Sequence, residues 1–405
     1  MVLNLISIPN NKIKYLDGLR GLAALIVVVH HFLLGFYPGH LTGNSYETHL
    51  GDGAFEMYIS KSPWNILAGG NFAVCVFFVL SGYVLTKKLQ EKETNFILFY
   101  SVKRYFRLFL PVTFTILLSH ILLSCSLNYS LEAGVIAKSD WWFRTFCASK
   151  PSFDYLIKSI FIEVFFREST FYNTAFWSMS IELLGSFLLF AAIILNKYTK
   201  NNLLLNVLLL FVVSQFNKYP YYCCFIGGLI ISQLEIKKQV VENINLPILS
   251  FGACILGIYF GSFPISTNYS GYLYSNVHAF LMWESPVSYH VLGSILLLAG
   301  LVFNKKMHHY LENNYLLFLG RISFAVYLLH SLILTSWASF IFLKCFPLMG
   351  YDYSFLVSFF TSFIILILLS ILMTCFIDDP SILLSEKIAK LLLPKHYKTE
   401  PSAKN

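Results

Sequence analysis

An arginine and a histidine lie eleven residues apart in one long apolar stretch of the sequence, Arg20 and His31. In an α-helix this spacing corresponds to a rise of about 16 Å. If Arg20 lies at a membrane surface, His31 lies near the middle of an apolar core about 30 Å thick. An imidazole can act as a general base, and a guanidinium can bind a phosphate group. Because ionisable groups at that depth usually face a polar cavity or a partner, the pair marks a candidate site.

The composition indicates that membrane-spanning helices position these residues. Hydrophobic residues make up 57% of the 405-residue chain and charged residues 12%, and the mean hydropathy is +0.65. Such a chain is too apolar for an ordinary soluble protein. We therefore predict an all-α, polytopic integral membrane protein with about ten transmembrane helices. The ten apolar stretches are 19–37, 70–87, 108–126, 174–196, 203–216, 220–235, 247–262, 288–304, 317–343 and 354–377.

The distribution of Lys and Arg predicts the orientation. With a cytosolic N-terminus, most of the 29 Lys and Arg residues flank the predicted spans on the inner side, as the positive-inside rule requires. We expect both termini in the cytosol, with a short segment 1–11, a membrane domain 12–380 and a basic tail 381–405. Residues 382–393 are amphipathic and are expected to lie along the inner membrane surface. The aromatic-rich outer segment 127–173 predicts an interfacial or partly re-entrant lid, with a further pair of short spans as the alternative.

Three cations gather at the inner mouth of the third predicted span, Lys103, Arg104 and Arg107, ahead of Pro111. Such an array of donors suits phosphate groups, and a plain topology anchor is the alternative interpretation. The other basic residues are spread along the inner edges of the spans, where they face anionic membrane lipids. The formal net charge of +8 therefore gives no reason to expect nucleic acid as a partner.

Several common catalytic motifs are absent from the sequence. It contains no Gly-rich phosphate loop, no Gly-x-Ser-x-Gly elbow, no His-Glu-x-x-His helix and no metal-ligand spacing among its eight cysteines. Nucleotide hydrolysis, serine hydrolysis and zinc chemistry therefore lose support, and we expect no bound metal. A multi-span transporter of a small polar or proton-coupled solute is the alternative class, because buried ionisable residues also build transport paths.

Five motifs, in order along the chain, resemble those of the acyltransferase-3 family of integral membrane acyltransferases. They are Leu16-Asp17-Gly18-Leu19-Arg20-Gly21-Leu22 through His31, Phe77-Phe78-Val79-Leu80-Ser81-Gly82-Tyr83, Arg104-Tyr105-Phe106-Arg107 with Pro111, Trp177-Ser178-Met179-Ser180-Ile181-Glu182, and Gly320-Arg321-Ile322-Ser323 through Tyr327 and His330. The resemblance covers residues 12 to 385, almost the whole chain.

Three departures from the family pattern stand out. The last span ends in Asp378-Asp379-Pro380 where the family commonly has Glu-x-Pro, and Lys103-Arg104 stands in place of a double arginine. His30 beside His31 leaves open which imidazole acts, although the spacing from Arg20 favours His31.

The resemblance implies an acyl-CoA donor, most often acetyl-CoA, and an acceptor hydroxyl on a glycan, a glycolipid or another small alcohol. The protein would then be an acyl-CoA-dependent O-acyltransferase in which His31 is the general base. Arg20 and Glu182 are its expected catalytic partners, with Glu182 orienting or charge-balancing an imidazole. Some family members carry an extra soluble domain after the last span, and this chain is expected to stand alone.

The remaining site residues are also expected from the resemblance. The CoA contacts are expected from Arg20, Lys103, Arg104, Arg107, Ser81 and Tyr83, and the acceptor contacts from His330, Trp177 and Ser323. Helical depth places His31, Glu182 and His330 near the membrane midplane and the arginines at the inner edge.

Structural interpretations stand beside these functional ones. Glu182 can bridge two helices, Ser81-Gly82 can serve helix packing, and His330 can bond a backbone carbonyl. Asp17 either caps the first helix, with Gly18 as the first helical residue, or pairs with an arginine.

Overall fold

The computed structural model describes residues 13–146, 150–215, 220–238, 246–265, 274–281 and 285–393. The predicted segment 1–11 and the part of the predicted tail from residue 394 lie outside the described residues. Every regular element in the described part of the chain is helical. The all-α prediction is therefore confirmed.

Among the described residues, six continuous helical segments are long and apolar enough to cross a membrane. They are α2 (Lys14–Phe36), α5 (Gly70–Leu89), α6 (Thr94–Ser124), η4 with α11 (Thr174–Phe176, Trp177–Asn196), α18 with η5 and α19 (Asn314–Ile333, Leu334–Ala338, Ser339–Met349), and α20 with η6 and α21 (Tyr351–Met373, Thr374–Asp378, Asp379–Leu392). The protein is thus an integral, multi-pass membrane protein, as the sequence predicts.

Shorter helices occupy the remaining apolar stretches. These are α12 (Asn202–Ser214), α13 (Tyr222–Lys238), α14 (Leu246–Gly261) and α16 (Val287–Phe303). A bend of 108° separates α16 from α17 (Lys305–Leu311). Each of the ten predicted stretches therefore contains helix, whereas the count of ten spans and the side on which the termini lie stay predictions.

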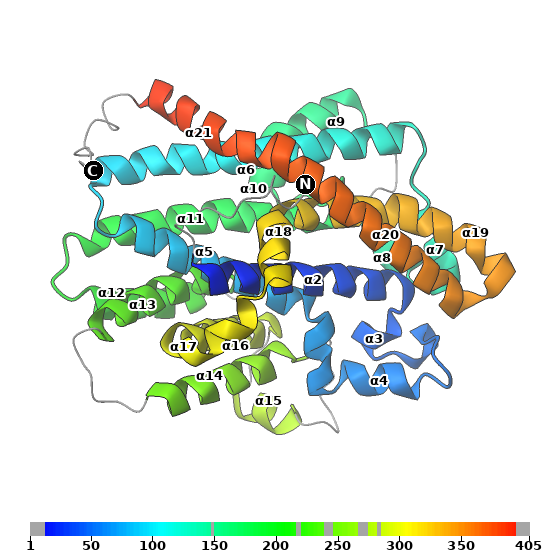
Figure 1. Ribbon diagram of the computed structural model, residues 1–405, viewed down its shortest axis with the longest axis horizontal. Coiled ribbons are helices and arrows are strands. Elements are labelled where there is room, and N and C mark those ends of the chain that lie inside the picture. Colours follow the sequence, from blue (N-terminus) through cyan, green and yellow to red (C-terminus); the bar gives the residue numbers. More distant parts are fainter. Residues whose placement is uncertain are drawn as a thin grey trace.

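The first span lies at the centre of the arrangement. α2 packs between α5 and α18, α5 also contacts α13 and α16, and α16 packs on α14 (Figure 1). On the other side, α6 contacts α11 and α21. The C-terminal ends of α5 and α13 lie side by side, because Lys87 near the end of α5 pairs with Glu235 near the end of α13 at 3.0 Å.

Glycines bring α2 and α18 into backbone contact. A Cβ added at Gly21 would lie 2.7 Å from the backbone nitrogen of Gly320, and one added at Gly320 would lie 2.6 Å from the carbonyl carbon of Asp17. Nonbonded carbon atoms normally settle at about 3.5–4.0 Å, so only glycine fits at these positions. Small residues permit this close approach between membrane helices. The glycines of the first and last motifs therefore place Arg20 and Arg321 at the same end of neighbouring helices.

Short helices connect the spans at the opposite end. Between α2 and α5 lie α3 (Gly39–Thr42), η1 (Ser45–Glu47), α4 (Ala54–Ser60) and η2 (Pro63–Ala68), and α15 (Ser275–Leu281) precedes α16. Segment 127–173 contains α7 (Ser130–Ala137), α8 (Asp140–Phe143), α9 (Phe153–Lys158), the π-helical η3 (Ser159–Glu163) and α10 (Val164–Phe166).

Part of this segment lies along α6. The ring of Phe161 is 5.6 Å from Phe109, and that of Phe165 is 5.7 Å from Tyr105. None of the helices described between residues 127 and 173 is long enough to count as a span. Whether this segment is a partly re-entrant lid or holds a further pair of short spans stays a prediction.

The C-terminal helix does not form a separate tail at residue 380. α20 continues through the π-helical turn η6 into α21, and α21 packs against α6. Lys103 on α6 pairs with Glu386 on α21 at 2.6 Å. The amphipathic stretch expected along the membrane surface is therefore attached to a span.

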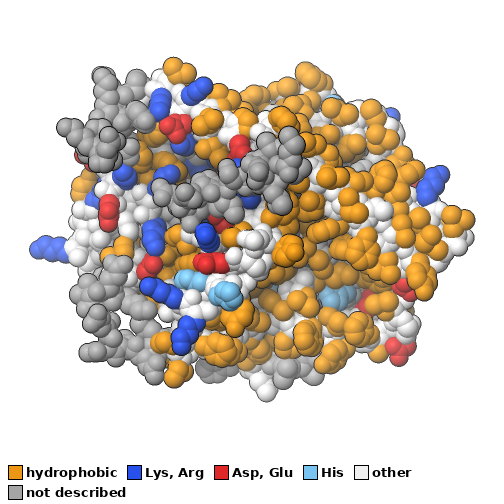
Figure 2. Space-filling model, in the orientation of Figure 1, with side chains coloured by type: hydrophobic (Ala, Val, Ile, Leu, Met, Phe, Trp, Pro, Cys, Tyr) orange, Lys and Arg blue, Asp and Glu red, His pale blue; other side chains and the backbone are white. Residues whose placement is uncertain are grey.

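The basic residues gather at one end of the molecule, as their distribution in the sequence predicts. Figure 2 shows Lys and Arg side chains gathered toward the end of the molecule where α5 ends and α6 begins. Hydrophobic side chains cover most of the other half of this face. Such a basic end beside an apolar surface is typical of membrane proteins with a basic inner side.

Candidate active site

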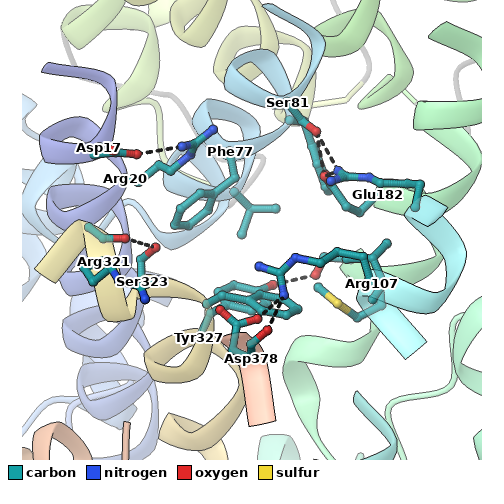
Figure 3. Close-up of a pocket in the computed structure, with 18 of the residues that line it drawn as sticks. Asp17, Arg20, Phe77, Ser81, Arg107, Glu182, Arg321, Ser323, Tyr327 and Asp378 are labelled. Carbon is teal, nitrogen blue, oxygen red and sulfur yellow. Dashed lines mark hydrogen bonds and ion pairs between the residues drawn. The ribbon is translucent and has the colours of Figure 1, made fainter. Parts of the chain in front are cut away.

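A cavity of about 300 Å³ opens among α2, α5, α6, α11, α18 and η6. Its volume lies at the lower end of the range for small-molecule sites. Six residues predicted from the sequence line it: Arg20, Ser81, Arg104, Arg107, Glu182 and Ser323. Figure 3 shows side chains from several helices pointing into this space, among them the guanidinium of Arg107. Tertiary packing therefore joins residues from all five family-like motifs in one cavity.

Arg20 is held by the residue one turn before it. Its Nη1 donates to Oδ1 of Asp17 at 2.8 Å, and the Asp17 side chain is almost fully buried. α2 begins at Lys14 with Ile13 as its N-cap, so the interpretation of Asp17 as the N-cap is wrong. The alternative, that Asp17 pairs with an arginine, is confirmed.

Arg104 and Glu182 form an ion pair across α6 and α11. Ser81 on α5 donates to Oε1 of Glu182 at 2.7 Å and accepts from Nη2 of Arg104 at 2.8 Å. Nε of Arg104 also donates to Ser186 at 3.1 Å. The expectation that Glu182 orients an imidazole is therefore wrong, because Glu182 lies with the arginines and bridges helices.

The Asp378-Asp379 departure from the family pattern supplies two further ion pairs. Asp378 pairs with Arg107, which also donates to Ser381 at 2.9 Å, and Asp379 pairs with Arg321. The π-helical turn η6 and the start of α21 thus attach to both α6 and α18. π-Helical turns inside α-helices are frequent at functional sites.

Arg321 is a cavity residue that the sequence interpretation did not single out. It stands within the fifth family-like motif, and Phe324 and Tyr327 follow it at three-residue intervals on α18. Residues three and four apart share a face of a helix. Because all three line the cavity, this spacing was the available signal.

Five predicted site residues lie outside the cavity lining, and three of them, Lys103, Tyr83 and Trp177, contact other residues. Lys103 pairs with Glu386, and Tyr83 donates to Glu235 at 2.6 Å. The ring of Trp177 packs 5.0 Å from Tyr221. None of the three lines the cavity among the described residues. Direct contact of Lys103 or Tyr83 with a donor in this cavity is therefore unsupported.

His31 and His330 lie together farther along α2 and α18. Nδ1 of His31 is 3.2 Å from Nε2 of His330, although 299 residues separate them in the sequence. His330 is fully buried and His31 is partly exposed. The indole of Trp142 on α8 lies beside His31, with ring centroids 5.8 Å apart.

The neighbouring His30 is engaged elsewhere. It is buried, and its Nδ1 lies 2.7 Å from the carbonyl oxygen of Ala68. A Cβ added at Gly70, the first residue of α5, would contact the His30 ring. His30 thus fastens the start of α5 to α2, which favours His31 as the imidazole available for chemistry.

One aromatic layer separates the cavity from the histidine pair. Tyr327 and Phe77 both line the cavity, with ring centroids 5.9 Å apart. Tyr327 lies one turn from His330, at 5.8 Å between ring centroids, and its hydroxyl is 2.7 Å from that of Ser178. Tyr327 therefore contacts Phe77 at the cavity and His330 beyond it.

The described residues contain no group of three or more His, Cys, Asp or Glu side chains arranged to hold a metal ion. The fold and this cavity define a multi-pass membrane protein with an arginine-rich site at one end of its helix bundle. Comparison with known families gives the class its name. The profile described as an acyltransferase domain matches residues 13–376, so the chain belongs to the acyltransferase-3 family.

A curated relative supports the same class. The chain is 32% identical over 108 residues to the O-acetyltransferase PaAT-1 of Phomopsis amygdali. This match covers 25% of the present chain and 20% of that protein, so the chain spans about a fifth of the length of this relative. No solved structure matches the chain.

Proposed function

We propose that this protein moves an acyl group, which we take to be acetyl, from acyl-CoA to a hydroxyl of a glycan, a glycolipid or another small alcohol. The observation that carries the proposal is the cavity lined by Arg20, Arg104, Arg107 and Arg321 within a chain of the acyltransferase-3 family. Arginine is well suited to phosphate because its planar guanidinium can donate two hydrogen bonds at once. CoA carries several phosphate groups and a long pantetheine arm, so it suits a cationic site connected to a deeper reaction centre.

The ion pairs of the cavity suit reversible binding of such a donor. Each of the four arginines already faces a carboxylate, and their side chains keep 14–29% of their exposure. Paired cations avoid the high cost of isolated buried charges. Because a guanidinium has five N–H groups, it can bind a phosphate oxygen while it keeps its carboxylate partner.

In the proposed reaction His31 is the general base. The imidazole takes the proton of the acceptor hydroxyl while that oxygen attacks the thioester carbonyl, which gives a tetrahedral oxyanion. The oxyanion collapses to the ester, the carbon–sulfur bond breaks, and the CoA thiolate leaves and takes up a proton. The expected partners are acyl-CoA, the acceptor and the surrounding lipids, and no nucleic acid is needed.

The acceptor is proposed to meet His31 on the side of Trp142. Tryptophan offers a flat apolar surface with one polar N–H, which suits the apolar face of a sugar ring as well as a hydrophobic alcohol. Phe143 and Phe146 pack behind Trp142 at 4.8 and 5.1 Å in their ring contacts. The indole is therefore a supported surface beside the base.

Transfer of labelled acetyl from acetyl-CoA tests the proposal. Membranes containing wild type, His31→Ala, Arg20→Ala and the control His309→Ala, which changes an exposed histidine of α17, are compared at equal protein levels. Mass spectrometry of glycans and lipids should find label in a product with wild type and His309→Ala but not with His31→Ala. Equal labelling in all membranes, together with no CoA binding by the purified protein, would refute the proposal and direct attention to transport.

A further inference from the structure

The hydrogen-bond partners of His31 and His330 determine where each ring carries its proton. Nδ1 of His31 lies 3.0 Å from the carbonyl oxygen of Val27, and Nδ1 of His330 lies 3.3 Å from that of Val326. Both carbonyls stand four residues earlier on the same helix. Since a carbonyl oxygen can only accept a hydrogen bond, each Nδ1 carries the proton, and each Nε2 of the neutral rings carries a lone pair.

This assignment gives the contact between the two rings a direction. Nε2 of His330 is 3.2 Å from Nδ1 of His31, so the N–H of His31 donates to the lone pair of His330 as well as to Val27. The described residues provide no hydrogen-bond partner for Nε2 of His31. The unprotonated nitrogen of a partly exposed ring is therefore left available beside Trp142.

We propose that His330 is a positioning residue that holds His31 in its base-competent form. This inference rests on the proposed acyl transfer. His330 keeps the proton of His31 on Nδ1 and the lone pair on Nε2. When Nε2 takes the proton of the acceptor hydroxyl, the resulting imidazolium keeps a hydrogen bond from Nδ1–H to the lone pair of His330. A base oriented by a third group is the general logic of catalytic triads, here with a neutral imidazole as the third group.

Buried hydroxyls support His330 from the other side. Oγ of Ser331 lies 3.3 Å from Nε2 of His330 and 2.8 Å from Oγ1 of Thr174. Both hydroxyl residues are buried. Thr174 begins the short helix η4 before α11, and its neighbour Asn173 donates from Nδ2 to the carbonyl oxygen of Leu328 at 2.7 Å.

These polar contacts also account for the irregular backbone that precedes α11. Residues 167–173 have no regular helix, yet Asn173 is buried against α18. Within a membrane protein, irregular backbone is stable only where the protein satisfies its polar groups or where it lines a polar cavity. The segment before α11 thus places polar groups on α18 at the level of His330.

The test compares two replacements of His330 in the full-length protein. His330→Gln keeps an acceptor oxygen near the position of Nε2, whereas His330→Met has a similar length and no comparable acceptor. A hydrogen bond to a charged group contributes enough to change kcat about tenfold to a hundredfold. We expect His330→Met to lower kcat by this factor with unchanged KM for the donor, and His330→Gln to keep kcat within about threefold of wild type.

A matched control separates this effect from loss of packing. His290 on α16 is also buried, and its Nε2 lies 2.8 Å from the carbonyl oxygen of Phe263. We therefore expect His290→Met to lose about as much stability as His330→Met but to keep the kcat of wild type. Equal kcat in His330→Met and wild type, or equal losses in His330→Gln and His330→Met, would overturn the inference.

A second readout does not depend on acyl transfer. Nitrogen-15 NMR of the histidine-labelled protein in lipid, with the His31 signals assigned by their loss in His31→Asn, reports the proton position directly. We expect protonated Nδ1 and unprotonated Nε2 in His31, with its Nδ1 signal displaced in His330→Met. A proton on Nε2, or a His31 signal unmoved by His330→Met, would overturn the inference even if no acyl transfer were found. An inactive wild type with the expected spectrum would instead refute the proposed function alone.

Discussion

Replacement of Gly320 by alanine tests whether the close contact between α2 and α18 holds the active site together. The new Cβ would lie 2.6 Å from the carbonyl carbon of Asp17, whereas nonbonded carbon atoms settle at about 3.5–4.0 Å. The two helices must therefore separate by about 1 Å at this level. Overpacking of this kind costs about 1–3 kcal/mol.

Separation of α2 and α18 would also displace the residues of the proposed active site. Asp17 holds Arg20 at 2.8 Å, and the 3.2 Å contact between His31 and His330 joins the same two helices farther along. Misplacement of catalytic groups by 1 Å can lower a rate on the order of a hundredfold. We expect Gly320→Ala to lower both the thermal stability of the purified protein and the rate of acetyl transfer.

Gly252 on α14 offers a matched control. A Cβ added there meets nothing within 4 Å, and alanine is better than glycine in a helix by about 1 kcal/mol. Gly252→Ala should therefore keep its activity and be at least as stable as wild type. Stability is measured as the temperature at which half of the protein leaves the monodisperse peak in size-exclusion chromatography. Equal stability and activity of Gly320→Ala and Gly252→Ala would refute the packing argument.

Three further predictions concern donor binding and pH. Arg321→Gln should raise the KM for the acyl-CoA donor about tenfold through loss of a charge-assisted hydrogen bond. Lys103→Gln should leave this KM unchanged in the same steady-state assay, because Lys103 lies outside the cavity. Similar KM values for the two variants would contradict the assignment of the cavity as the donor site. Tyr83→Phe should likewise keep the donor KM and lower thermal stability, since its hydroxyl bonds Glu235; a raised KM would place Tyr83 at the donor. His40 follows the first span, and burial lowers the pKa of its imidazole from 6.5 to about 4, so the unfolded chain binds the proton first and stability falls as the pH drops from 6.5 toward 4. Thermal stability should therefore change less between pH 6.5 and pH 4 in His40→Gln than in wild type. An equal change in both proteins would argue against a lowered pKa of His40.

The positions of the helices could be predicted from the sequence because apolar runs are local. A stretch of about twenty apolar residues in a membrane must satisfy its backbone hydrogen bonds within itself, and a helix does so. All ten predicted stretches accordingly contain helix, including those too short to qualify as spans by length. The boundary predicted at residue 380 had no such local signal, and a π-helical turn carries the chain through it.

The cavity could be predicted only in part. The motifs identified Arg20, Arg104 and Arg107, but they did not show that Lys103 faces away. Successive residues on a helix differ by about 100° in direction, so adjacent cations in the sequence can point to different neighbours. Which direction faces the cavity depends on how α6 packs against α11 and α21.

Composition and local motifs were enough to predict the class of this protein, its helical segments and most of the charged residues at its site. The partners of those residues, in contrast, depend on how the helices pack. Glu182 meets Arg104 instead of an imidazole, and Asp379 meets Arg321. His31 meets His330 across 299 residues. Such pairs depend on the rotation and distance of packed helices, which the glycines at the contact of α2 and α18 permit but which no local stretch of sequence specifies.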